Sequence, residues 1–170
     1  MASLIENLIT VLNEENSEYE TLLAVSMEKT DTIVGGDVNA LNELVAREQS
    51  IVERINKLEK KRIEATGDIA IVLNRKPEEL TLGSLAELLS SRKAESDAIK
   101  DVHDRLKSTL ERMVRVNESN KVLLQESIEM VDFELNLAQS LKQAPTTANY
   151  SGNSYTNDSY GPTGSFDAKQ

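Results

Sequence analysis

The stretch from Ile99 to Ala138, IKDVHDRLKSTLERMVRVNESNKVLLQESIEMVDFELNLA, decides the fold because apolar residues recur along it every three or four positions. A seam runs through it at a mean spacing of about 3.5 residues, the period of a coiled coil. We therefore predict one long helix from about Glu95 to Gln143, on the order of 70 Å in length. The seam consists of Ile99, Val102, Leu106, Leu110, Met113, Asn117, Asn120, Leu124, Ile128, Val131, Leu135 and Ala138.

Two asparagines, Asn117 and Asn120, interrupt this otherwise apolar seam. In one interpretation they pair with polar residues of other helices, such as Glu15 or Glu48, and fix the alignment of the helices. In the other they mark the point where the long helix leaves its neighbours and presents its C-terminal half to a partner. The apolar residues beyond them favour a protein partner, since so long a stripe rarely stays in water. These residues are Leu123, Leu124, Ile128, Val131, Leu135 and Leu141.

Two further long helices are predicted in the N-terminal half. The first runs from about Leu4 to Val34, and Gly35-Gly36-Asp37 ends it, because glycine accepts the left-handed conformation and Asp37 can cap the next helix. The second starts at Val38 and reaches the sixties or low seventies. So short a connection makes the two helices antiparallel. The stripe of the first helix contains Ile5, Leu8, Leu12, Tyr19, Leu22 and Ile33, with Glu15, Ser26 and Lys29 as its polar positions.

The region between Thr66 and Ser91 is less regular. Gly67-Asp68 weakens the helical pattern and Pro77 interrupts any helix that reaches it. The sequence from Thr81 to Leu89 is typical of a short capped helix with one apolar face. We predict an all-α fold for residues 1–143, an elongated antiparallel bundle or coiled coil of three long helices with a short connecting helix.

A change of composition separates residues 144–170 from the helical part. Ala144-Pro145 ends the last helix, and the residues that follow are mainly Ser, Asn, Gly, Thr and Tyr. This composition predicts a disordered C-terminal tail, because it offers too little apolar surface to bury. Four of the six aromatic residues of the chain lie here, and they are interpreted either as short recognition sites or as residues without a specific role. They are Tyr150, Tyr155, Tyr160 and Phe166.

Composition excludes several classes of function. The 170 residues include 29 Asp and Glu against 19 Lys and Arg, a formal net charge of −10, which repels the phosphates of nucleic acids. With no cysteine, the chain has no disulfide and no thiolate metal site. The apolar run from Ile69 to Leu73 is far too short to span a membrane. The N-terminus lacks the pattern of a signal peptide, so we expect a cytoplasmic location.

Asp101, His103 and Asp104 are the one cluster with a composition suited to catalysis or metal binding. On a helix, Asp101 and His103 point to different faces and cannot share a metal or a proton. Lys100 stands three residues before His103, so the Glu-x-x-His motif of di-metal bundles is not formed. We therefore expect no catalytic residues, no metal and no cofactor, and predict that the protein is not an enzyme.

Several motifs together resemble the FlgN family of flagellar export chaperones. The order of elements over residues 4–142 is similar, and Thr81-Leu82-Gly83-Ser84-Leu85-Ala86 matches the connector of that family. Asn117-x-x-Asn120-x-x-Leu123-Leu124 looks like its Asn-x-x-Asn-x-x-Leu-Leu signature. Tyr160-Gly161-Pro162-Thr163-Gly164 is similar to the Tyr-Gly-x-x-Gly ends common there.

The resemblance implies a cytosolic chaperone without ATPase activity. Such a chaperone binds the terminal helices of hook-associated (filament-junction) proteins, prevents their premature assembly and delivers them to the type III flagellar export gate. Its expected partners are therefore a hook-associated protein and the export apparatus. We expect the C-terminal half of the third long helix to carry client binding, because it can accept an amphipathic helix. The candidate partner-binding residues are Asn117, Asn120, Leu123, Leu124, Ile128, Val131 and Leu135.

A second hypothesis remains open, a structural coiled-coil protein whose third long helix forms a homodimer and has no chaperone role. It explains the seam, the acidic composition and the lack of catalytic residues equally well. Ile128→Asp combined with Leu135→Asp distinguishes the two hypotheses. A chaperone is expected to lose client binding and stay a helical monomer, whereas a structural protein is expected to lose its dimer.

Overall fold

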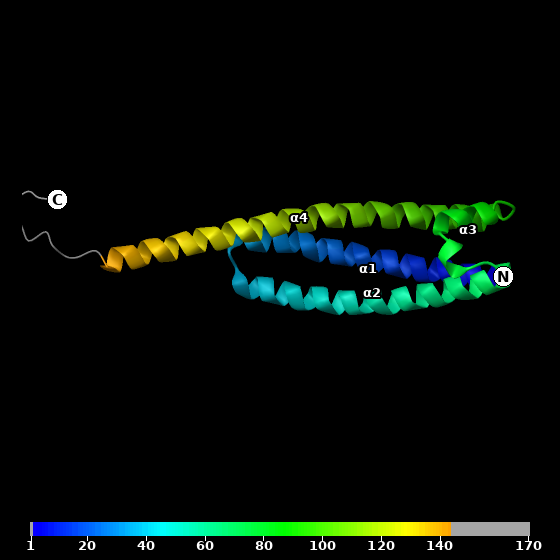
Figure 1. Ribbon diagram of the computed structural model, residues 1–170, viewed down its shortest axis with the longest axis horizontal. Coiled ribbons are helices and arrows are strands. Elements are labelled where there is room, and N and C mark those ends of the chain that lie inside the picture. Colours follow the sequence, from blue (N-terminus) through cyan, green and yellow to red (C-terminus); the bar gives the residue numbers. More distant parts are fainter. Residues whose placement is uncertain (1, 144–170) are drawn as a thin grey trace, which may run out of the picture. The chain divides into compact units, whose positions relative to one another are not determined.

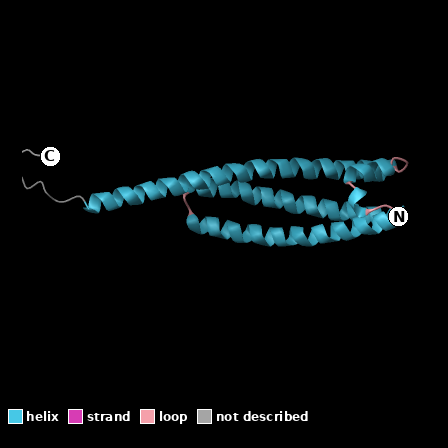
Figure 2. Cartoon of the chain, in the orientation of Figure 1, coloured by secondary structure: helices cyan, strands magenta, loops and turns pink. Residues whose placement is uncertain are grey.

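The computed structural model describes residues 2–143, which form four α-helices and one turn of 3-10 helix and contain no strand (Figures 1 and 2). The prediction of an all-α fold with three long helices and a short connecting helix is confirmed. The predicted disordered tail, residues 144–170, lies outside the described residues. The helices are α1 (Ala2–Gly35), α2 (Val38–Leu73), α3 (Leu82–Leu88) and α4 (Lys93–Gln143), and the 3-10 turn spans Pro77–Glu79.

The chain divides into two units, Met1–Phe133 and Glu134–Gln170. The boundary falls within α4, whose last turns belong to the second unit. None of the described helices is long and apolar enough to cross a membrane.

The turn between α1 and α2 has the predicted geometry. Gly36 has a φ of 69°, a conformation that favours glycine because it has no Cβ. The Asp37 carboxylate then accepts a hydrogen bond of 3.0 Å from the backbone N–H of Ala40 and caps α2. As a result, α2 runs back along α1 in the antiparallel direction (Figure 1).

Helix α4 runs parallel to α1 and therefore antiparallel to α2. Near its start, the Arg105 guanidinium donates to Oδ1 of Asn13 over 2.6 Å. Further along, the Asn120 amide donates to the backbone carbonyl of Ser26 over 2.8 Å. Because the partners on α1 and α4 advance together, the two helices share one direction.

The core consists of two clusters. The larger joins the start of α1, the end of α2, α3 and the start of α4, and it contains Ile5, Leu8, Leu12, Ala65, Ile69, Ala70, Leu80, Leu85, Ala86, Leu89, Ile99, Val102 and Leu106. The smaller lies between α1 and α2, with Met113 of α4 packed against it, and contains Leu22, Val25, Leu44, Ile51 and Ile55. Burial of the C-terminal end of α2 in the larger cluster explains why this helix continues through Gly67 instead of ending there.

Up to Asn120, the buried face of α4 differs from the predicted seam at two positions, and beyond it the seam residues Ile128, Val131, Leu135 and Ala138 are exposed. Thr109 is buried where the prediction has Leu110, which is 36% exposed, and Asn117 is exposed. The residues that face the bundle keep strict alternating steps of three and four, through Leu106, Thr109, Met113 and Asn120. The prediction preferred apolar Leu110 to polar Thr109, but the Thr109 hydroxyl finds a buried acceptor in Asn16 at 3.4 Å.

Candidate partner-binding groove

Three cavities follow one another along α1 between α2 and α4, and we call them together the α4 groove. The first has a volume of about 610 Å³ and lies over Leu12, Glu15 and Tyr19 of α1. The second has about 520 Å³ and lies over Leu22, Ser26 and Lys29. The third has about 300 Å³ and extends from Thr32 and Ile33 to the turn at Gly36. The floor of the groove is thus the stripe of α1 that the sequence identified.

Five of the seven predicted partner-binding residues line this groove. Asn117, Asn120, Leu124 and Ile128 line the second cavity, and Leu124, Ile128 and Val131 line the third. The other two are placed elsewhere. Leu123 is half-buried and lines none of the three cavities, and Leu135 is an exposed residue of the second unit.

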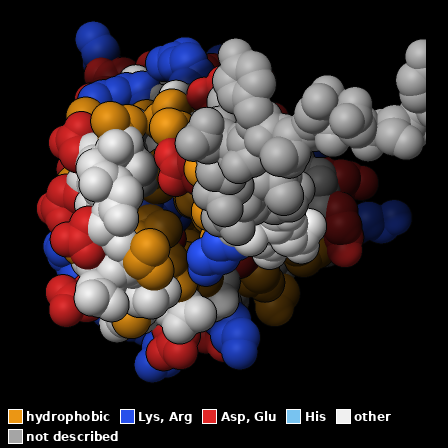
Figure 3. Space-filling view, turned by 90° about the vertical axis from the view of Figure 1, so that its left-hand side faces the viewer, with side chains coloured by type: hydrophobic (Ala, Val, Ile, Leu, Met, Phe, Trp, Pro, Cys, Tyr) orange, Lys and Arg blue, Asp and Glu red, His pale blue; other side chains and the backbone are white. Residues whose placement is uncertain are grey.

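Asn120 is the last buried residue of α4, and Leu123 and Leu124 after it are half-buried. After Asn120, large apolar side chains of the first unit are exposed on different sides of the helix: Val122, Ile128, Met130, Val131 and Phe133. Of these, Ile128 and Val131 line the groove, and we call this pair the exposed apolar row of α4. At the end of the molecule that carries the α1–α2 turn, hydrophobic side chains are visible in the gaps between acidic and basic ones (Figure 3). Exposed apolar side chains beside an open groove are typical of a surface that binds another protein.

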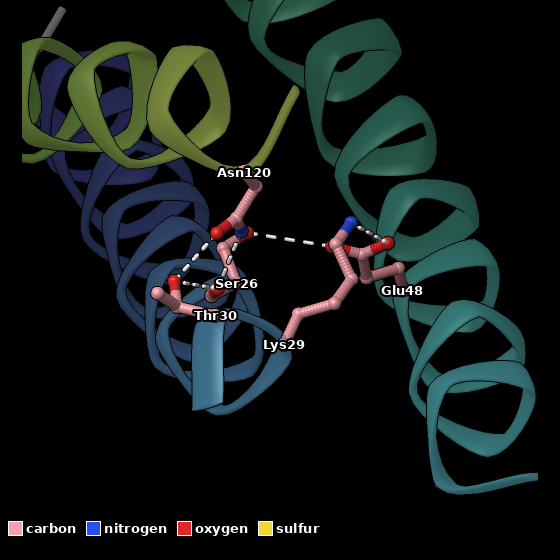
Figure 4. Close-up of polar contacts among 5 residues, drawn as sticks. All are labelled: Ser26, Lys29, Thr30, Glu48 and Asn120. Atoms are coloured by element: carbon pink, nitrogen blue, oxygen red, sulfur yellow. Dashed lines mark hydrogen bonds and ion pairs between the residues drawn. The ribbon is translucent and has the colours of Figure 1, made fainter. Parts of the chain in front are cut away.

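Asn120 is held by a polar network on α1 (Figure 4). It is only 3% exposed, its Oδ1 accepts a 2.6 Å hydrogen bond from the Thr30 hydroxyl, and its amide donates to the Ser26 carbonyl. The Ser26 hydroxyl donates to Glu48 of α2 at 3.4 Å, and Lys29 binds both oxygens of the same carboxylate at 2.7 Å. The direct partners of Asn120 are therefore Ser26 and Thr30, whereas the sequence suggested Glu15 or Glu48.

We expect Asn120→Ala to lower the free energy of unfolding by about 1–2 kcal/mol, because it removes two buried hydrogen bonds and leaves a small cavity. Asn117→Ala is the matched control. Its side chain is exposed, so the change is expected to stay within about 0.5 kcal/mol. Urea unfolding of both variants followed by circular dichroism measures the difference. Equal effects would show that the Asn120 network does not align α4 with α1.

A second interhelical contact lies in the first cavity. The Glu15 carboxylate is buried, and its Oε2 lies 3.1 Å from Nε of Arg62 on α2. Neither of these two atoms makes a hydrogen bond, so the contact is an ion pair of poor geometry. Burial raises the pKa of Glu15, Arg62 opposes the increase, and Glu59 adds to it. Burial, and after it the Glu15 charge, also raises the pKa of Tyr19.

The raised pKa of Glu15 predicts a pH-dependent gain in stability from Glu15→Gln. Above the unfolded-state pKa of 4.5, the folded wild-type chain binds more protons than the unfolded chain, so its stability falls as pH rises through the folded-state pKa. Glutamine lacks this charge. The stability of the variant relative to wild type is therefore expected to be higher at pH 7 than at pH 4. Thermal unfolding at the two pH values measures it, and a difference independent of pH would contradict the assignment.

Asp101, His103 and Asp104, which the sequence analysis considered for metal binding, lie on the surface of α4. His103 Nδ1 lies 3.2 Å from Asp104, while Asp101 pairs with Arg105 at 2.9 Å. Within residues 2–143, no group of three or more His, Cys, Asp or Glu side chains is arranged to hold a metal ion.

Some residues of the groove were not among the predicted site residues. Leu110 and Val114 of α4 line the first cavity, and Val52 of α2 lines the second. All three are exposed apolar residues beside the buried stripes. In the sequence, these residues stand out only because they lie next to an apolar stripe. Which side of a three-helix bundle stays open becomes apparent only when the helices are packed.

Comparison with known proteins places this chain in a family. The model of one family, described as FlgN protein, matches residues 1–158, which include α1 to α4. The chain belongs to the FlgN family. The uncharacterized protein YvyG of Bacillus subtilis (strain 168) is 24% identical over 119 residues, which cover 70% of this chain and 71% of that protein. No solved structure matches the chain.

Membership of the FlgN family agrees with the expectation from the connector and the asparagine motif. FlgN proteins are flagellar export chaperones. The α4 groove is therefore the candidate site for a client of this FlgN-family chain.

Proposed function

We propose that this protein is a cytoplasmic export chaperone that binds the terminal helices of hook-associated proteins. In this role it prevents their premature assembly and delivers them to the type III flagellar export apparatus. The proposed activity needs no catalytic residue and no cofactor, because binding and release of a helix are sufficient.

The observation that supports this proposal best is the exposed apolar row of α4 beside an open groove. Filament-junction proteins assemble through amphipathic terminal helices, which expose an apolar face until they are incorporated. A chaperone must cover that face reversibly, and an amphipathic helix in an apolar groove is a recurring way to do so. Ile128 and Val131, which are 55% and 54% exposed, are available for such contacts.

Size-exclusion chromatography with light scattering tests the proposal. The full chain is analysed alone and mixed with a hook-associated protein encoded in the same genome. A complex of defined mass that persists on the column is the expected result, and it should not form with a truncated hook-associated protein that lacks its terminal helices. If no complex forms, the chaperone proposal is wrong.

The homodimer hypothesis is tested in the same experiment. The exposed apolar row that would bind a client would also suit a second copy of the chain, so the mass of the isolated protein is informative. A stable homodimer that does not bind the hook-associated protein would favour a structural coiled-coil role.

A further inference from the structure

The α4 wall of the groove carries cations without ion-pair partners. Lys107 and Arg115 line the first cavity, Lys121 lines the second, and all three are exposed. None of the three takes part in an ion pair within the described residues. In a chain with a net charge of −10, three such cations along one wall are a marked local excess. The acidic residues of the same wall are Glu111 and Asp132.

In the first two cavities, the charges on the opposite wall and on the floor are already paired. Arg62 of α2 lies against Glu15 and Glu59, and Glu48 of α2 binds Lys29 of α1. The electrostatic preference of these two cavities is therefore set by the α4 wall, from Lys107 to Lys121, whereas the charged residues of the third cavity are Asp37 and Asp132.

We propose that the α4 groove takes one amphipathic helix whose apolar face lies on α1 and whose acidic flank faces Lys107, Arg115 and Lys121. This inference rests on the proposed function, because the occupant is the terminal helix of the client. It extends that function in two ways. Binding uses the first cavity as well as the C-terminal half of α4, and the client is recognised by acidic residues as well as by its apolar face.

The spacing of the three cations defines the occupant further. Lys107, Arg115 and Lys121 follow one another at intervals of eight and six residues, so at about 1.5 Å per residue they lie roughly 12 Å and 9 Å apart along α4. Both intervals are close to one heptad. An occupant helix that packs alongside α4 therefore presents acidic residues about seven positions apart on one flank, as charged flanking positions do in coiled coils. With such a helix in place, the three-helix arrangement becomes a four-helix bundle.

A triple charge reversal tests this inference. The variant carries Lys107→Glu, Arg115→Glu and Lys121→Glu in the full chain. A matched control carries Lys61→Glu, Lys100→Glu and Arg112→Glu, which reverse exposed cations that neither line the groove nor form ion pairs. Both variants change the net charge equally. Binding to the hook-associated protein is measured by titration calorimetry at low and high salt, after circular dichroism has verified folding.

The expected result is at least about a tenfold loss of affinity for the groove variant at low salt, and near wild-type affinity for the control. High salt should weaken wild-type binding and reduce the difference, because it screens exposed charges. If the groove variant fails to fold, glutamine at the same three positions replaces glutamate, with a smaller expected loss.

Each other outcome overturns a specific statement. If wild type binds the client and the groove variant binds equally well, the charge-recognition inference is wrong while the chaperone function stands. If wild type does not bind at all, the proposed function itself is wrong. If the isolated wild-type chain is a dimer that the groove variant breaks, the occupant of the groove is a second copy of this chain.

Discussion

Ile128→Asp combined with Val131→Asp is expected to lower the affinity for the hook-associated protein by roughly a hundredfold, equivalent to about 3 kcal/mol. Both side chains line the third cavity and are more than half exposed. Aspartate would place two charges where an apolar face has to pack, so the loss combines missing contacts with the desolvation of carboxylates. Because neither side chain belongs to the core clusters, the fold itself should be retained.

The chain offers a closely matched control for this double variant. Ile63 and Val72 of α2 have the same residue types at similar exposure, 61% and 52%, and line none of the three groove cavities. Ile63→Asp with Val72→Asp should therefore bind the client like wild type. Titration calorimetry compares the two. Equal losses in both variants would mean that general surface polarity, and not the exposed apolar row of α4, controls binding.

Ile99→Ala is expected to lower the free energy of unfolding by about 3 kcal/mol, because it removes fully buried apolar volume and leaves a cavity. Ile99 has no exposed surface and joins the start of α4 to the larger core cluster, which includes the start of α1 and the end of α2. Loss of its side chain therefore weakens the end of the bundle where all the helices meet.

Urea unfolding with Ile63→Ala as control measures this effect. Ile63 is exposed, so its truncation should change the free energy of unfolding by no more than about 0.5 kcal/mol. The slope of the unfolding free energy against urea should be unchanged for both variants. A loss below about 1 kcal/mol for Ile99→Ala would contradict the placement of α4 against the larger cluster.

The helical organisation could be predicted because each signal was local. The glycine–aspartate turn, the Thr81 cap and the periodic pattern of the last long helix depend on residues close together in sequence, and the structure contains the turn, the cap and the helix. The buried face of α4 was predicted less well at Thr109. A polar residue is accepted there because an amide on a neighbouring helix receives its hydrogen bond, and that amide, Asn16, is distant in sequence.

The candidate site could be predicted only in part. The asparagine motif and the apolar residues after it identified the α4 side of the groove, including Leu124 and Ile128. The groove itself has a floor from α1 and a second wall from α2, and no local pattern shows which faces of three helices remain open. Similarly, the exposed cations Lys107, Arg115 and Lys121 are distinguished from other surface cations only by their position beside the cavities.

Site-specific photo-crosslinking tests most directly the claim that the α4 groove holds the terminal helix of a client. A photoreactive residue is placed at position 128 in the groove, and at position 63 as the control, in the full chain mixed with the hook-associated protein. We predict crosslinks from position 128 to the terminal helix of the hook-associated protein, and none from position 63. Crosslinks of equal yield from both positions, or crosslinks from position 128 only to a second copy of the chain, would contradict the account.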